Sequence, residues 1–264
     1  MKTVIQVYKI GYINADSTAY HGIGDFIRST LGIYYLSKIH NFNLIVDFSL
    51  HPIQKYIEYT EHIFSDYIKE QNNNIHFIAH EHDIMSFINN SPNEAVILSG
   101  YIGLEAYYNP ITQDAQLFIQ NLLKPNKKMQ EYIDSKLQEI PFPRYNILHY
   151  RLGDNELVRG IKNHYNVNHI MNHNEKNDIL ISDSITFKEL VKKSDSNIFM
   201  FESNICHMGF HKDSNMQDTV FEFFLASKAE KIKSYSIYDW ASGFTRIVSF
   251  IYNIPIEYNT NIIL

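Results

Sequence analysis

One arginine near the middle of the chain stands where a predicted strand gives way to a glycine, in the run His149-Tyr150-Arg151-Leu152-Gly153-Asp154. A guanidinium group carries five N–H donors in a planar fork, and this geometry matches the oxygens of a phosphate bidentately. The glycine lets the backbone approach a ligand closely. Arg151 is therefore a candidate phosphate ligand; the alternative is an Arg–Asp pair that only ties the turn together.

A second candidate is the glycine pair Gly22 and Gly24, which opens a predicted helix in the segment Gly22-Ile23-Gly24-Asp25. The exposed N–H groups at the start of a helix favour an anion or a sugar hydroxyl. The segment lacks the third glycine of a dinucleotide fingerprint and the Lys-Ser/Thr of a phosphate-binding P-loop. An ordinary tight turn between a strand and a helix is the alternative interpretation.

Two further polar segments also follow predicted strands or open predicted helices. Asp183, in Ser182-Asp183-Ser184, is either a polar clamp on a ligand or part of a simple helix cap. Glu222 lies on a largely apolar helix, which indicates a paired carboxylate or one that holds a donor-rich ring such as guanine. The Ser242-Gly243-Phe244 turn before an apolar helix is another potential anion site. The alternatives are an ordinary surface acid for Glu222 and an ordinary helix cap for the Ser242-Gly243-Phe244 turn.

The elements that position these segments alternate between strand and helix periodicity. In the first half, this pattern predicts strands at 3–10, 43–48, 75–79 and 95–99 and helices at 26–39, 53–70, 115–123 and 126–139. In the second half, it predicts strands at 145–150, 178–182, 198–201 and 232–235 and helices at 185–193, 219–229 and 244–252. Such alternation is typical of parallel sheets covered by helices, whose ligands bind outside the carboxyl ends of the strands.

Two prolines divide the predicted elements into two series. Pro141 and Pro143 enforce an extended path between them. The length of 264 residues also exceeds the roughly 100–200 residues of one typical domain. We therefore predict an α/β protein of two doubly wound lobes that face one another, with boundaries at 1–140 and 141–264.

The composition argues against several classes of partner. The net charge is −6 and the pI is about 6.1, whereas nucleic-acid binders carry a basic surface. Cys206 is the only cysteine, which excludes an internal disulfide and a multi-cysteine zinc site. No apolar run approaches the roughly 18–20 residues of a membrane span. We expect a soluble, cytoplasmic protein of bacterial or viral type, without a transmembrane segment or a nucleic-acid partner.

Clustered histidines raise the question of a metal ion. His76, His80 and His82 are close in sequence, and His169 and His173 have i, i+4 spacing. A zinc site needs three or four converging ligands, and these histidines lie in asparagine-rich surroundings without a supporting cysteine. We therefore predict no metal ligand. We interpret residues 163–177 as a mobile loop over the ligand cleft that orders when the ligand binds.

Taken in order along the chain, these segments resemble the fucosyltransferase superfamily, which includes α1,2-, α1,6- and protein O-fucosyltransferases. The central family motif reads His-x-Arg-Arg-Gly-Asp, and residues 149–154 match it at five of six places when the free position is counted. The family's glycine turn before a helix resembles residues 22–28, and its strand ending in Ser-Asp resembles residues 181–183. Its acidic helix resembles residues 222–229, and its closing Ser-x-Phe segment resembles residues 242–244. The resemblance spans nearly the whole chain.

This resemblance implies a GT-B-like fold and an inverting transfer from the co-substrate GDP-fucose to a glycan acceptor, with no metal and no other cofactor. The first lobe would be the acceptor side, and the second lobe would bind the sugar nucleotide. Arg151 would bind the β-phosphate, and His149 would line the nucleotide pocket. Asp183 and Glu222 would contact ribose or guanine. The turn at residues 242–244 would hold the diphosphate from the other side, and Gly22 and Gly24 would add donor contacts.

The sequence departs from the family motif at Leu152, where a second arginine is usual. Arg28, Arg159 or Lys162 would have to supply the missing positive charge. The catalytic base is open: Asp154 is expected as a ligand or orienting residue and Glu156 as a base, because a carboxylate can take the proton of an acceptor hydroxyl, and Asp25 is a further candidate. Two alternative functions remain, a transferase that uses another nucleotide sugar and a non-catalytic binding module with a degenerate site.

Overall fold

The computed structural model describes residues 1–10, 22–70, 75–78, 81–99, 111–153, 156, 164–194, 197–209 and 216–262. Contacts divide the chain into two compact units, Met1–Asn126 with Met208–Ser214 and Lys127–His207 with Asn215–Leu264. The division falls between Asn126 and Lys127, ahead of the boundary expected at residue 140. The helix that directly follows this division packs within the second unit, where the Tyr132 hydroxyl donates to Asp218 at 2.7 Å.

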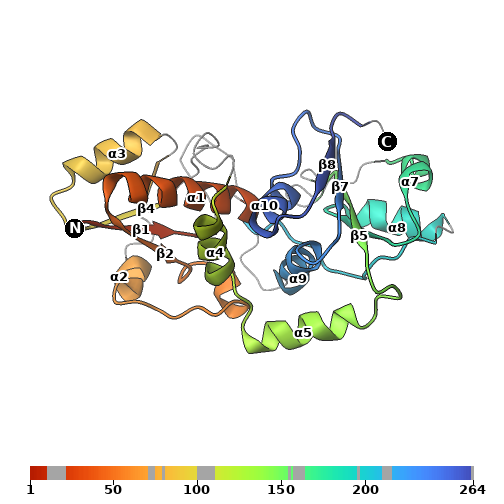
Figure 1. Ribbon diagram of the computed structural model, residues 1–264, viewed down its shortest axis with the longest axis horizontal. Helices are drawn as coiled ribbons and strands as arrows, with labels where there is room; N and C mark the ends of the chain where they lie inside the picture. Colours follow the sequence, from red (N-terminus) through yellow and green to blue (C-terminus); the bar gives the residue numbers. More distant parts are fainter. Residues whose placement is uncertain are drawn as a thin grey trace. The chain divides into compact units, whose positions relative to one another are not determined.

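The first unit is built on a parallel sheet. Its described strands are β1 (Thr3–Val7), β2 (Asn43–Asp47), β3 (His76–Phe77) and β4 (Ala95–Ser99), in the order β2-β1-β4-β3. Its described helices are α1 (Ile23–His40), α2 (Ser65–Glu70), α3 (Glu81–Asn90), α4 (Gln113–Leu122) and the 3-10 helix η1 (Pro52–Lys55). Helices α1 and α3 lie on one side of the sheet and α2 on the other (Figure 1).

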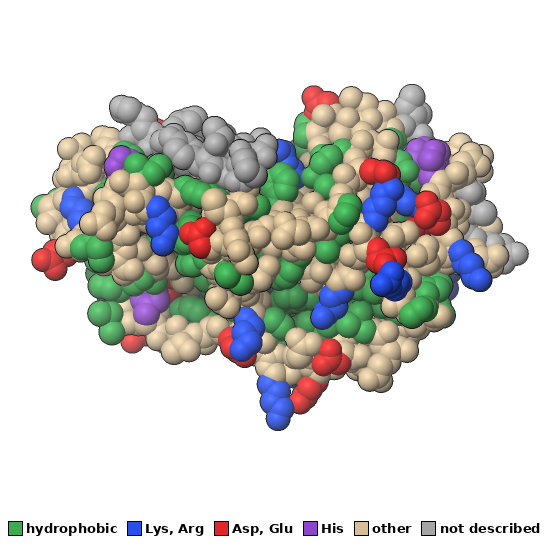
Figure 2. Space-filling model, viewed as in Figure 1, with side chains coloured by type: hydrophobic (Ala, Val, Ile, Leu, Met, Phe, Trp, Pro, Cys, Tyr) green, Lys and Arg blue, Asp and Glu red, His purple; other side chains and the backbone are tan. Residues whose placement is uncertain are grey.

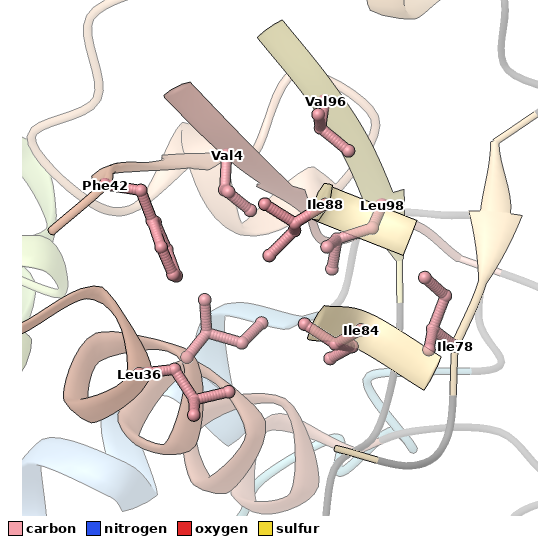
Figure 3. Packing of buried hydrophobic residues seen from close by; sticks show 9 residues of the cluster. Val4, Leu36, Phe42, Ile78, Ile84, Ile88, Val96 and Leu98 are labelled. Atoms are coloured by element: carbon pink, nitrogen blue, oxygen red, sulfur yellow. The ribbon is translucent and has the colours of Figure 1, made fainter. Parts of the chain in front are cut away.

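The core of the first unit lies between this sheet and helices α1 and α3. Val4 and Val96 on the strands face the helices, where Leu36 and Ile84 belong to the same buried cluster (Figure 3). Alternate residues on β1 therefore serve opposite faces of the sheet, because successive side chains of a strand point to opposite sides. Ile5 accordingly joins a second cluster, on the side of Ile68 in α2.

The second unit repeats this architecture with a second parallel sheet. Its described strands are β5 (Asn146–Arg151), β6 (Asp178–Ser182), β7 (Ile232–Ser236) and β8 (Ile256–Asn259), in the order β6-β5-β7-β8. Its described helices are α5 (Lys127–Leu137), α7 (Asn168–His173), α8 (Ile185–Lys193), α9 (Met216–Ala226) and α10 (Gly243–Tyr252). Helices α9 and α10 cover one face of the sheet, and α7 and α8 cover the other (Figure 1).

The expected α/β class with two parallel sheets is present, and most elements lie where their periodicity predicts them. The helix expected at 53–70 is wrong, since the structure has only η1 and α2 there. Tertiary contacts override the helical pattern: Glu58 N–H donates to Lys124 O at 2.7 Å, and the Tyr59 hydroxyl donates to Asp47 at 2.6 Å. His62 also contacts that carboxylate, at 2.8 Å.

Three smaller differences concern the second unit. The strand expected at 198–201 is reduced to a single bridge between Ile179 and Phe199. The loop expected at 163–177 contains α7, which Ile170 anchors in the core. Strand β8 was not predicted, although Ile256 and Tyr258 alternate with polar residues as a strand pattern requires.

No helix in the described part of the chain is long and apolar enough to cross a lipid bilayer. On the face of the molecule shown in Figure 2, basic and acidic side chains are interspersed over the described residues.

Candidate functional site

Arg151 is the last residue of β5, at the carboxyl end of a central strand of the second sheet. Its Nη1 atom forms an ion pair with the Asp183 carboxylate, which belongs to the loop after the neighbouring strand β6. The other carboxylate oxygen of Asp183 accepts a hydrogen bond from Leu152 N–H at 2.6 Å. One buried carboxylate therefore fixes both the guanidinium group and the backbone that follows it.

Gly153 completes this turn because no side chain fits there. A β-carbon at residue 153 would lie 2.2 Å from the carbonyl oxygen of Asp183 and 2.7 Å from its carbonyl carbon. The loops after β5 and β6 are therefore in direct backbone contact, and the glycine allows Asp183 to reach back to Arg151. This close approach is the reason for a glycine at this position of the motif.

One aromatic ring in the loop between β7 and α10 lies next to Arg151, and a second ring stacks on the first. The centre of the guanidinium group is 5.8 Å from the centre of the Tyr238 ring, within the range of a cation–π interaction. The Trp240 ring stacks on Tyr238 with centroids 4.9 Å apart and planes inclined by 12°. The backbone of this loop is held in place, since Asn261 N–H donates to Tyr238 O at 2.9 Å.

His149 fixes the start of α10 to the sheet. It lies two residues before Arg151 on β5, and its Nδ1 atom is 3.3 Å from Ser234 Oγ on β7 and 3.4 Å from Thr245 Oγ1 on α10. The two hydroxyl groups are themselves 3.2 Å apart. This buried polar triangle holds the first turn of α10 beside the strand that carries Arg151.

The expected anion turn at residues 242–244 is the start of α10. Ser242 is the N-cap and is buried, and its side chain makes no capping hydrogen bond. Gly243 is the first helical residue, and the Phe244 ring lies 6.3 Å from that of His149. The N-terminal end of a ten-residue helix, with its partial positive charge, therefore lies in the same unit as Arg151 and is tied to the same strand.

Burial lowers the pKa of His149 to about 4; the Asp183 carboxylate acts against this shift, and the Arg151 charge adds to it. In the first unit, burial lowers the pKa of His51 to about 3. Its Nε2 atom is 2.9 Å from Met208 O, and its ring stacks on Tyr8. Both imidazoles are therefore neutral in the folded protein at pH 7, and His149 adds no charge to the site.

These two histidines predict a loss of stability in mild acid. Below pH ~6.5 the unfolded chain takes up protons on both imidazoles while the folded protein does not. Each should lower the free energy of unfolding by about 1.4 kcal/mol per pH unit between pH ~6.5 and its folded-state pKa. Urea unfolding of His149→Asn should show a shallower pH slope than the wild type, and His164→Asn, at an exposed histidine, should not. Equal slopes in all three proteins would contradict this assignment.

Glu156 is the second carboxylate expected in the site, and the structure shows it at the start of α8. Its Oε1 atom accepts hydrogen bonds from the N–H and the hydroxyl of Thr186, both at 2.9 Å, and its Oε2 atom accepts one from the Ser184 hydroxyl. Ser184 is itself the N-cap of α8. Both carboxylate oxygens are therefore engaged in capping a helix, and the Ser184 cap agrees with the sequence-based interpretation.

Glu222 is buried on α9 and forms an ion pair with a lysine on α8. Lys188 Nζ is 3.5 Å from its Oε1 atom, and the side chains of both residues are less than a tenth exposed. Ser203 joins the pair: its hydroxyl accepts from Lys188 at 2.6 Å and donates to Glu222 at 2.9 Å. Burial raises the pKa of the Glu222 carboxyl, and Lys188 acts against this rise.

The remaining expected residues lie elsewhere or outside the described part of the chain. Gly22 is the N-cap of α1 in the first unit, and Gly24 lies in the first turn of that helix. The Arg28 Nη1 atom lies 3.6 Å from the Asp25 Oδ1 atom on the same helix. Leu152 is fully buried in the apolar cluster around Tyr150, so its side chain serves the core. Asp154, Arg159 and Lys162 are outside the described residues.

The histidine clusters form no metal site among the described residues. His169 contacts the Tyr150 hydroxyl at 2.7 Å and stacks on His173. Among the described residues, no group of three His, Cys, Asp or Glu side chains could hold a metal ion. His80 is not among the described residues, and the described side chains do not include those of His76 and His82.

Sequence reasoning missed the roles of three residues. Tyr238 and Trp240 stand in the segment that it singled out, but only the contacts identify Tyr238 as a neighbour of Arg151 and Trp240 as the ring stacked on it. Lys188 could have been found, because it shares a buried helical stripe with Ser184, Phe187 and Val191. A lysine in such a stripe needs a buried partner.

Comparison with solved structures finds fucosyltransferases. NodZ α-1,6-fucosyltransferase soaked with GDP-fucose aligns with a TM-score of 0.57 at 12% identity, over 97% of this chain and 94% of that one. Fucosyltransferase NodZ from Bradyrhizobium aligns with a TM-score of 0.57 at 13% identity, over 97% and 94%. No protein-family model matches the sequence, and comparison with curated proteins finds no relative.

Two further solved structures align along the chain as well. An Arabidopsis thaliana FUT1 variant in complex with GDP has a TM-score of 0.55 at 11% identity, over 97% of this chain and 70% of that one. POFUT1 in complex with GDP has a TM-score of 0.50 at 12% identity, over 97% and 98%. The chain has the fold of these fucosyltransferases. The GT-B-like α/β class predicted from the sequence is thereby confirmed.

Proposed function

We propose that this chain is a fucosyltransferase that moves L-fucose from GDP-fucose to a glycan hydroxyl, with inversion at the anomeric carbon and without a metal ion. The observation that carries the proposal is the position of Arg151. It stands at the carboxyl end of a central parallel strand, oriented by Asp183. Ligands of such sheets bind at this edge, and the fold is shared with enzymes solved with GDP-fucose or GDP.

The chemistry of the transfer explains why these groups are needed. As the bond between the sugar and the diphosphate breaks, negative charge grows on the leaving GDP. Arg151 and the N–H groups at the start of α10 would stabilise that charge, because they are already oriented before the reaction. The neutral His149 holds the α10 start in position, and Asp183 acts through the guanidinium group that it orients.

The other carboxylates take separate roles in the proposal. Glu222 would accept hydrogen bonds from the donor-rich edge of guanine. Asp154, which directly follows Gly153, would orient the acceptor hydroxyl and take its proton as the hydroxyl oxygen attacks the anomeric carbon and GDP departs. Glu156 is assigned to the cap of α8 and takes no proton in this scheme, because both of its oxygens already accept hydrogen bonds. Gly22 and Gly24, at the start of α1, are the proposed source of further backbone N–H contacts to the donor.

Calorimetry with GDP, GDP-fucose, UDP and ADP tests the donor assignment. We expect GDP and GDP-fucose to bind at least about tenfold more tightly than UDP or ADP, a difference of about 1.4 kcal/mol. Binding and turnover should persist in EDTA. The H1–H2 coupling constant of the transferred sugar in the ¹H NMR spectrum should show the anomeric configuration opposite to that of the donor. If GDP binds no better than UDP or ADP, the guanine assignment fails.

The same experiment separates the two alternative functions. Preference for UDP or ADP would indicate a transferase with another nucleotide sugar. Tight binding of GDP-fucose without transfer or hydrolysis would indicate a binding module, the alternative that Leu152 makes relevant by replacing a second arginine with a core residue.

A further inference from the structure

The tryptophan that stacks on Tyr238 is exposed, in contrast to His149 and Ser242 of the candidate site. Tyr238, beside Arg151, and Trp240, stacked on Tyr238, form what we call the aromatic platform. Trp240 is 58% exposed, whereas His149 is 4% and Ser242 is 1% exposed. The platform therefore leads from the buried part of the site to its solvent-facing rim.

The platform is held rigidly, although its outer ring is exposed. Tyr238 N–H donates to Ser236 Oγ at 3.1 Å, and Tyr238 O accepts from Asn261 N–H at 2.9 Å. Tyr238 thus supports one face of the indole from a fixed backbone. A ligand that covered the exposed indole would remove apolar surface from water, which contributes about 25 cal/mol per Å² to binding.

We propose that Trp240 is the stacking surface for a pyranose ring of the acceptor glycan; this inference rests on the proposed transferase function. It departs from the sequence-based expectation that only the first lobe is the acceptor side. The face of an aromatic ring is electron-rich, and the C–H face of a pyranose matches it. The neighbouring Asp239 is exposed, and its carboxylate can accept hydrogen bonds from sugar hydroxyls. An acceptor also enters from solvent, where Trp240 is, while the diphosphate has to reach Arg151, whose side chain is only 19% exposed.

The guanine base of the donor is the competing occupant, because bases also stack on aromatic rings. Two features of the structure favour the glycan. Glu222, the carboxylate proposed to read guanine, is buried on α9, whereas the platform belongs to the exposed loop between β7 and α10. Asp239, beside Trp240, offers acceptors to hydroxyl groups, which every ring of a glycan carries.

Trp240 is the only tryptophan in the chain, so fluorescence excited at the indole band reports on this position alone. The GDP-loaded protein should be titrated with cellotetraose, chitotetraose and lactose, whose rings present different C–H faces. Mannitol is the control, since it has hydroxyl groups but no ring. We expect a saturable change in emission with at least one oligosaccharide and none with mannitol.

Variants then separate stacking from general surface effects. Trp240→Leu should weaken binding of the responding oligosaccharide about tenfold or more, measured by calorimetry, and Trp240→Phe should retain most of the affinity. GDP affinity should be unchanged in both. Tyr67→Leu is the matched control, because Tyr67 is an exposed aromatic residue (53%) on α2 of the first unit, and it should leave glycan binding unchanged.

Three results would overturn the inference. These are no emission change with any of the three oligosaccharides, an emission change produced by GDP alone and absent with glycans, or equal glycan affinity in Trp240→Leu and wild type. In each case, GDP binding to the wild type would leave the proposed transferase function standing. Failure of the wild type to bind GDP would instead refute that function.

Discussion

Replacing Arg151 with alanine should weaken GDP binding about 100- to 10,000-fold while the protein stays folded. The expected size follows from the geometry of the contact. A guanidinium group can donate two parallel charge-assisted hydrogen bonds to a phosphate, and each is worth about 1.5–3 kcal/mol. Calorimetry with GDP measures the loss, and urea unfolding shows whether the variant is folded.

The folded state should tolerate the change because Asp183 keeps a second partner. Its carboxylate also accepts from Leu152 N–H, so it is not left without a hydrogen bond. The lost ion pair should lower the free energy of unfolding by about 1–3 kcal/mol. Arg151→Lys retains the charge but not the planar fork, and its GDP affinity should lie between those of Arg151→Ala and the wild type.

Arg144 offers a matched control within the same unit. It lies just before β5, at the opposite end of the strand, and its exposed side chain is paired with Glu230 at 3.0 Å. Arg144→Ala removes the same charge from the protein and should leave GDP affinity unchanged. The assignment of Arg151 is refuted if its alanine variant binds GDP as tightly as the wild type, or if Arg144→Ala weakens binding equally.

The order of elements could be predicted because periodicity and turn residues are local signals. The strands at 95–99 and 178–182 and the helix at 185–193 have the predicted bounds. The helix expected at 53–70 failed for a non-local reason. Asp47, at the end of β2, collects hydrogen bonds from Tyr59 and Ser65, and no periodicity within 53–70 carries that information.

The candidate site was predictable as a set of strand ends, but its pairings were not. Arg151 and Asp183 come together because β5 and β6 are parallel neighbours whose carboxyl ends meet at one edge. The sequence does not specify which acid reaches the arginine, and Asp154 was the nearer candidate. The contacts of Glu156 were hidden for the same reason: its place near the motif predicted a base, and nothing in the sequence indicated that its carboxylate also accepts hydrogen bonds at the start of α8.

Breaking the buried pair of Lys188 and Glu222 should have the largest effect on stability. Lys188→Met removes the cation and leaves the buried Glu222 carboxylate, which still accepts a hydrogen bond from Ser203. Loss of one partner of a buried ion pair costs about 3–5 kcal/mol. Urea unfolding at pH 8 should show this loss directly.

The pH dependence of the loss identifies its cause. Burial already raises the pKa of the Glu222 carboxyl, and removal of Lys188 should raise it further. A carboxyl group whose pKa is higher in the folded than in the unfolded state favours folding at low pH. This contribution to stability is lost as the pH rises above the unfolded-state pKa of about 4.3. The difference between Lys188→Met and wild type should therefore be small at pH 4 and large at pH 8.

The double variant Lys188→Met with Glu222→Leu separates structure from function. Because both charges are gone, its stability should return to within about 1–2 kcal/mol of the wild type. If Glu222 reads guanine, this stable protein should nevertheless lose its preference for GDP over ADP and UDP. A stable double variant that keeps the preference would leave Glu222 with a purely structural role, and a double variant as unstable as Lys188→Met would refute the ion-pair explanation.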